Sequence, residues 1–61
     1  MELRVVVRMD NAAFEPESGP EVARILRELA RRIEAGELSG RGESRALRDV
    51  NGNTVGSARL S

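Results

Sequence analysis

One stretch of this sequence repeats its apolar residues at the spacing of an amphipathic helix. The apolar positions recur at i, i+3, i+4, i+7 and i+11 and therefore share one side of a helix: Val22, Ile25, Leu26, Leu29 and Ile33. Ser18 and Pro20 are typical of a helix start, and Gly36 is typical of a helix end. A lone helix cannot bury such a stripe, so the rest of the chain must supply a surface that covers it.

The first ten residues alternate with the period of a half-buried β-strand. In residues 2–10 one side of the strand is apolar, with Leu3, Val5, Val7 and Met9. The other side is polar apart from Val6, which lies between Arg4 and Arg8. We expect the apolar side to pack under the helix stripe.

Residues 45–50 and 54–60 flank Asn51-Gly52-Asn53 and indicate a hairpin, because Asn and Gly both tolerate positive φ. Two registers are open. A two-residue turn pairs Val50 with Asn53, whereas a four-residue loop pairs Val50 with Val55 and sets Gly56 opposite Asp49, where a bulge or a close backbone approach is expected. The second register makes the better core, because it places three apolar residues on one face: Leu47, Ala58 and Leu60.

These elements predict a single α+β domain over residues 1–61, with the order β-α-β-β. One face of a three-stranded sheet packs on the amphipathic helix and the other face stays open. Phe14, the only aromatic residue, lies in a turn-rich connection and is expected to plug one end of the core. Its alternative role is a stacking platform for a base.

A chain of 61 residues with one aromatic side chain has little apolar surface to bury. Small domains make up such a deficit with disulfides, a metal or self-association. The chain has no cysteine and no histidine, which excludes disulfides and ordinary zinc sites. We therefore expect a homo-oligomer whose second subunit packs on the open sheet face or on a free sheet edge.

Charge and hydropathy restrict the partners. Ten acidic residues balance ten arginines, so no net field attracts nucleic acid, and nucleic acid is disfavoured as a partner. The longest apolar run, Val5 to Val7, is too short for a membrane span or a signal peptide. A cytoplasmic location is the expectation.

The sequence carries no recognisable catalytic site. It lacks His, Cys, Lys, Tyr and Trp, which supply most general bases and covalent nucleophiles, so we expect no enzyme, no cofactor and no metal. The run from Asp49 to Asn53 opens like a calcium loop. Glycine then falls at the fourth loop position instead of the sixth, and Leu60 occupies the twelfth, where a glutamate is required, so a hairpin turn is the preferred interpretation.

Three segments carry a resemblance to known proteins: Asp10-Asn11-Ala12-Ala13-Phe14, Glu21-Val22-Ala23-Arg24-Ile25-Leu26-Arg27, and Leu47-Arg48-Asp49-Val50-Asn51-Gly52-Asn53-Thr54-Val55-Gly56. Through them the chain resembles a group of short uncharacterised proteins of bacteriophages and other bacterial mobile elements. The resemblance implies an accessory protein of a mobile element. In that setting, binding of host immune components or sequestration of a nucleotide-derived immune signal is the implied anti-defence role.

The leading hypothesis is a non-enzymatic homo-oligomer that binds a phosphorylated, nucleotide-like small molecule between subunits, with arginines on phosphate and Asn amides on base or ribose. The candidate ligand-binding residues are Arg4, Arg8, Asn11, Phe14, Arg48, Asn51 and Asn53. One alternative is an adaptor or inhibitor that docks on a host protein through the open sheet face or an edge strand. Another is a small DNA-binding dimer whose paired N-terminal strands present Arg4 and Arg8.

Overall fold

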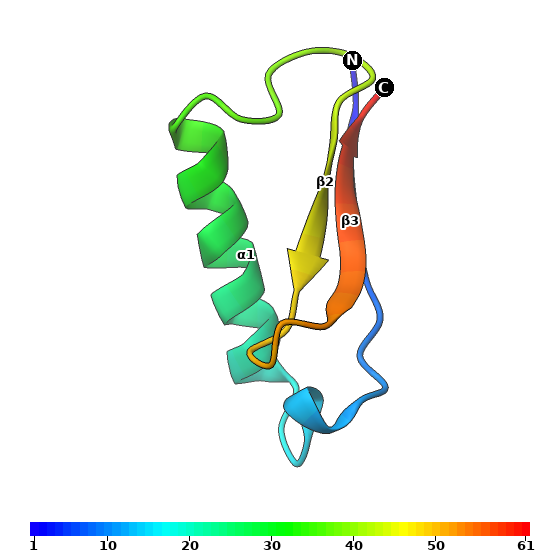
Figure 1. Cartoon of the computed structure of the whole chain (residues 1–61), viewed down its shortest axis with the longest axis vertical. Helices are drawn as coiled ribbons and strands as arrows, with labels where there is room; N and C mark the ends of the chain where they lie inside the picture. The colour runs from blue at the N-terminus through cyan, green and yellow to red at the C-terminus, as the bar shows by residue number, and fades with distance from the viewer.

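The computed structural model describes all 61 residues, with one α-helix packed against a three-stranded antiparallel sheet (Figure 1). The elements are β1 (Leu3–Val7), the 3-10 turn η1 (Ala12–Phe14), α1 (Gly19–Glu34), β2 (Ser44–Arg48) and β3 (Thr54–Leu60). The predicted α+β class and the order β-α-β-β are confirmed. The strand order is β1-β3-β2, so the last strand of the sequence is central and β1 and β2 form the two edges. None of the helical segments has the length and the hydropathy that a transmembrane span requires.

The helix ends where the sequence places its end. Gly36 has φ +97°, a conformation that glycine adopts without strain. Its N–H donates to the main-chain oxygen of Ile33 and the N–H of Glu37 donates to that of Arg32, both at 3.0 Å, which is the Schellman pattern. At the start, the side chain of Ser18 makes no capping hydrogen bond, and the helix begins at Gly19.

From Ser44 to Leu47 the hairpin has the register of the two-residue turn, with Leu47 opposite Gly56, and the preferred four-residue register, which sets Asp49 opposite Gly56, is wrong. Next to the turn the pairing shifts: Arg48 lies opposite Thr54, so Val55 is an extra residue that forms a bulge in β3. Val50 therefore leaves the strand and is 65% exposed. The predicted core face is nevertheless correct: Leu47 and Ala58 are buried and Leu60 packs against them.

Gly56 lies beside the bulge, at a close approach of β1 to β3. A Cβ atom built on this residue would collide with the main-chain oxygen of Val6. The expected close backbone approach at Gly56 is confirmed, although its neighbour across the hairpin is Leu47 and not Asp49.

The core lies between α1 and the β2–β3 hairpin. Its buried apolar residues are Phe14, Ile25, Leu29, Leu38, Leu47, Val55 and Ala58. Phe14 and Leu47 are the largest fully buried side chains, so the prediction that Phe14 plugs the core is confirmed. Phe14 reaches this position through η1, where the side chain of Asn11 accepts a hydrogen bond from the N–H of Ala13 at 2.9 Å.

The helix leaves most of β1 uncovered, contrary to the prediction from its stripe, and of this strand only Val7 packs against the core. Leu3 is 46% exposed and Val5 is 38% exposed, although both lie on the same sheet face as Ala58 and Leu60. On the helix, Leu26 and Ile33 are also exposed, at 43% and 39%. A helix about 10 Å wide covers roughly two strands that lie about 4.8 Å apart, and α1 packs over the β2 side of the sheet.

Candidate functional site

The outer edge of β2 is covered by arginine side chains. In β2 the main-chain oxygens of alternate residues point away from β3. Each of these oxygens accepts a guanidinium hydrogen bond: Ser44 from Arg45 Nη1 at 2.9 Å, Ala46 from Arg32 Nη1 at 3.1 Å, and Arg48 from Arg24 Nη2 at 3.0 Å. We call these three side chains the arginine cover of β2. Because it occupies the outward acceptors, another strand finds no free oxygen there for its N–H groups, which disfavours pairing at this edge.

Carboxylates hold the arginine cover in place. Arg24 pairs with Glu21 at 2.8 Å and with Glu28 at 3.1 Å. Glu37 accepts from Arg45 at 3.1 Å and from Arg32 at 3.3 Å. The hydrogen bond from Arg45, aided by Arg32, holds the pKa of Glu37 below its usual value against the opposing effect of burial. The edge cover is thus a set of ion pairs between α1, the loop that follows it and β2.

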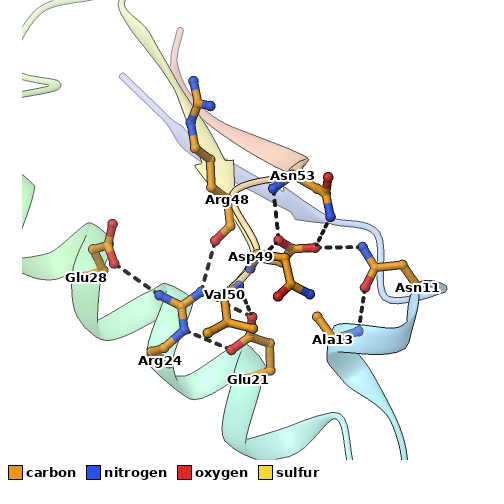
Figure 2. A network of polar contacts seen from close by, with 10 residues as sticks. Asn11, Ala13, Glu21, Arg24, Glu28, Arg48, Asp49, Val50 and Asn53 are labelled. Atoms are coloured by element: carbon orange, nitrogen blue, oxygen red, sulfur yellow. Dashed lines mark hydrogen bonds and ion pairs between the residues drawn. The ribbon is translucent and has the colours of Figure 1, made fainter.

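A polar network ties the hairpin loop to the rest of the chain (Figure 2). Asp49 is only 4% exposed, and its Oδ1 accepts from the N–H groups of Asn51 and Asn53, both at 2.9 Å. Its Oδ2 accepts from the side-chain amides of Asn11 at 2.8 Å and Asn53 at 3.1 Å. Glu21, 8% exposed, accepts from the N–H of Val50 at 2.7 Å.

Hydrogen bonding decides the ionisation of both buried carboxylates. Burial is the largest single influence on the pKa of Asp49 and raises it, but the bonds from Asn53, Asn11 and Asn51 together outweigh burial and lower the pKa. The hydrogen bond from Arg24 lowers the pKa of Glu21. No buried side-chain polar atom lacks a partner, so the network joins η1, α1 and the hairpin and leaves no buried donor or acceptor for a ligand.

The loop residues named from the sequence therefore have structural roles. Asn11 and Asn53 use their amides on Asp49, and the N–H of Asn51 does the same while its side chain is exposed. Phe14 is 2% exposed, which corrects the expectation that its ring faces a ligand. Periodicity gave no sign of these contacts, because Asn11 and Asp49 are 38 residues apart in the sequence.

The candidate arginines lie on the sheet face that points away from α1, which we call the open face. Arg4 alternates with the inward Leu3 and Val5, and Arg48 follows the buried Leu47. Arg8 extends the alternation of β1, since its N–H donates to the main-chain oxygen of Val55 at 2.7 Å. Alternation along β1 and β2 therefore directs Arg4, Arg8 and Arg48 to the same side of the sheet.

A fourth arginine lies on the open face that was not among the candidate residues predicted from the sequence. Arg59 lies directly opposite Arg4 in the β1–β3 ladder. Its outward direction follows from the alternation about Ala58, but its proximity to Arg4 depends on the pairing of the first strand with the last. Between the arginines the face carries mostly short side chains: Ser44, Ala46, Thr54 and Ser57. Its one acidic side chain is Glu2, which pairs with Arg4 at 2.8 Å.

A single depression adjoins the open face at the β2 edge. It has a volume of about 360 Å³ and is lined by Glu28, Arg32, Ala46 and Arg48. Glu28 and Arg32 are engaged in the ion pairs that hold the arginine cover. No group of three acidic side chains is placed to hold a metal ion.

Comparison with protein-family models, with curated proteins and with solved structures found no match to this chain. The chemistry of the open face is therefore inferred from its own residues. Guanidinium groups are suited to bidentate hydrogen bonds with phosphate or carboxylate oxygens. Of the four arginines there, only Arg4 makes an ion pair within the chain.

Proposed function

We propose that this chain is a non-enzymatic binding module whose open face binds the phosphate groups of an oligonucleotide. The observation that carries this proposal is the cross-strand pair of Arg4 and Arg59. Like charges directly opposite each other destabilise an antiparallel sheet. A phosphate bound between the two guanidinium groups converts that repulsion into attraction.

The spread of the arginines favours a ligand with several phosphates. Arg4 and Arg8 are four residues apart on an extended strand, which separates them by about 13 Å. Two separate phosphate groups therefore suit these side chains better than one. Of the residues that line the depression at the β2 edge, only Arg48 is an open-face arginine without an ion pair. A mononucleotide enclosed in this depression is therefore less well supported as the ligand than an extended phosphodiester chain that lies across the sheet.

The neutral net charge does not oppose this proposal. The carboxylates of Glu21, Glu28 and Glu37 are paired with the arginine cover of β2, away from the open face. The net charge of zero is therefore the sum of a positive sheet face and acidic groups located elsewhere.

The chain offers no exposed ring on which a base could stack. Phe14 is buried and no other aromatic residue exists, so we expect phosphate contacts with little sequence preference. The resemblance to mobile-element proteins implies sequestration of a nucleotide-derived signal. Such a signal would be bound by the same arginine–phosphate contacts, with a small molecule in place of an oligonucleotide.

Fluorescence anisotropy with a labelled single-stranded oligonucleotide tests the proposal. We expect binding at low salt that weakens as salt rises, because counterions are released from the phosphates. Arg59→Gln removes one phosphate contact and should lower the slope of log affinity against log salt by about 0.7. Competition by a cyclic oligonucleotide, by duplex DNA and by inorganic phosphate identifies the preferred phosphate source.

The matched control is Arg31→Gln. Arg31 is exposed on α1 and makes no ion pair, so this change removes the same charge from a different surface. Equal loss of affinity in Arg31→Gln and Arg59→Gln, or no binding to any oligonucleotide at low salt, would contradict the proposed site.

A further inference from the structure

The two edges of the sheet are not equivalent, and β1 is the free one. Glu2 and Ser61 exchange main-chain hydrogen bonds at 2.7 and 2.9 Å, so the even-numbered residues of β1 face β3. The N–H and C=O groups of Leu3, Val5 and Val7 consequently point outward. No loop or side chain bonds to them, whereas the outward oxygens of β2 are all covered.

We propose that two copies of this chain pair through β1, antiparallel and about a two-fold axis at Val5. The occupant of the free edge is then a second copy, and the charges along β1 select both the partner and the register. Outward main-chain groups of one copy meet those of the other only when odd-numbered residues pair with odd-numbered ones. This condition leaves five positions for the axis in the strand, at Leu3, Arg4, Val5, Val6 or Val7.

Charge and length distinguish these five registers. An axis at Arg4 sets Arg4 against its own copy, and an axis at Val6 sets Arg4 against Arg8, so both place like charges opposite each other. An axis at Leu3 or at Val7, the two ends of β1, sets most of the strand against residues that lie outside it. An axis at Val5 pairs residues 2–8 without a like-charge contact and sets Glu2 of each copy opposite Arg8 of the other.

The same register packs apolar side chains together. Leu3 lies beside Val7 of the second copy, and Val5 lies beside Val5 of the second copy, all on the sheet face that carries the helices. Of these residues, α1 leaves Leu3 and Val5 uncovered, at 46% and 38% exposed. Leu26 and Ile33 flank this surface from the helix, because they lie on the side of α1 opposite Arg24 and Arg32, which contact β2.

Assembly through β1 is also self-limiting. The product is a six-stranded sheet in the order β2-β3-β1-β1-β3-β2, in which both outer strands are β2 with its arginine cover. A further copy finds no free oxygen on either outer strand to accept from its N–H groups, so assembly stops at the dimer and does not continue to a fibre. The two-fold axis is perpendicular to the sheet, so the open faces of both copies join into one surface.

Single cysteines test the register, because the natural chain has none. The variants are Leu3→Cys, Arg4→Cys, Val5→Cys, Val6→Cys and Val7→Cys, and each forms a symmetric disulfide only when the axis passes through its own position. Val5 residues that pair across the axis have Cα atoms about 5.5 Å apart, within the range that a disulfide bridges. We expect Val5→Cys to cross-link at least tenfold faster than the other four under mild oxidation. Fastest cross-linking at any other position overturns the proposal, since at Val6 it indicates pairing in another register or through the open face.

Light scattering on the unmodified chain gives an independent measurement. We expect twice the monomer mass of 6.7 kDa and a thermal midpoint that rises with protein concentration. Val5→Pro removes an outward N–H but no bond to β3, and should give a monomer with an unchanged circular dichroism spectrum. A monomer mass and a constant midpoint over a hundredfold dilution overturn the proposal, and leave the edge free for a strand of another protein. Oligonucleotide binding is also measured with the Val5→Pro monomer. Because the open-face arginines of a single copy are unchanged in this variant, its binding tests the proposed function independently of the dimer.

Discussion

Arg32 of α1 donates a hydrogen bond from Nη1 to the main-chain oxygen of Ala46 at 3.1 Å, and so occupies a position on β2 that a neighbouring strand would otherwise take. Its Nε is held by Glu37 at 3.3 Å. One helical residue thereby anchors α1 over one edge of the sheet and closes that edge to pairing. The opposite edge receives no such contact, and this difference between β1 and β2 underlies both the apolar exposure at β1 and the proposed dimer.

Removal of the arginine cover should open the second edge of the sheet. In the double variant Arg24→Gln and Arg32→Gln, the outward oxygens of Ala46 and Arg48 lose their donors. We expect species larger than a dimer to accumulate with time and concentration in analytical ultracentrifugation, because each dimer then has free edges. The double variant Arg27→Gln and Arg31→Gln changes the net charge equally on the solvent side of α1 and should behave like the natural chain; larger species in both variants would point to charge and not to the edge.

Leu29 should contribute far more stability than Leu26, although both belong to the apolar stripe. Leu29 is 4% exposed in the core, whereas Leu26 is 43% exposed. We expect Leu29→Ala to lower the free energy of unfolding by about 2 to 4 kcal/mol, because it leaves a cavity. Leu26→Ala, measured by urea denaturation at the same protein concentration, should lower it by about 1 kcal/mol or less. Equal losses would place the helix in a different rotation about its axis.

Gly56 should not tolerate even a methyl group. The Cβ of alanine there meets the main-chain oxygen of Val6, which cannot move unless β1 separates from β3. Gly56→Ala should lower the free energy of unfolding by about 3 kcal/mol or more. Gly19→Ala is the control, since its Cβ meets nothing within 4 Å, and its circular dichroism melting curve should match that of the natural chain. Normal folding of Gly56→Ala would contradict the close approach of the two strands.

Acid should destabilise the fold through its hydrogen-bonded carboxylates. The pKa values of Asp49, Glu21 and Glu37 are all lowered from their usual values of 3.8 for Asp and 4.5 for Glu. As pH falls through this range, the unfolded chain binds protons that the folded chain does not, so the free energy of unfolding decreases. We expect urea midpoints to stay level above about pH 5 and to fall progressively below about pH 4.

Asp49→Asn identifies the share of Asp49 in this acid response. The variant keeps the size of the side chain but replaces one acceptor oxygen by a donor, next to the amides of Asn11 and Asn53. We expect a melting temperature lower by roughly 5 to 15 °C at neutral pH and a smaller further loss in acid. Glu34→Gln, at an exposed residue without an ion pair, is the control. An acid response of Asp49→Asn that is parallel to that of the natural chain would exclude Asp49 as a contributor.

Local patterns were sufficient for the elements and their inward faces. The spacing of Ile25 and Leu29 predicted the helix, Gly36 predicted its end, and alternation predicted that Leu47 and Ala58 share a face. Each of these depends on residues a few positions apart, whose relation the backbone geometry determines. The outward direction of Arg4, Arg8 and Arg48 is of the same kind.

Only the tertiary structure decided which surfaces are covered and which are free. The strand order makes β1 an edge, Arg24 and Arg32 hold α1 over the other edge, and a helix of about 10 Å cannot cover both. Leu26, Ile33, Leu3 and Val5 therefore stay exposed, although their spacing is that of core residues. The hydrogen bond from Asn11 to Asp49 joins residues 38 positions apart in the sequence, and the one from Val50 to Glu21 joins residues 29 positions apart. Arg59 and Arg4, which lie opposite each other in the sheet, come from the two ends of the sequence. Periodicity carries no information about such pairs, because they depend on how the packed elements meet and not on the spacing within any one of them.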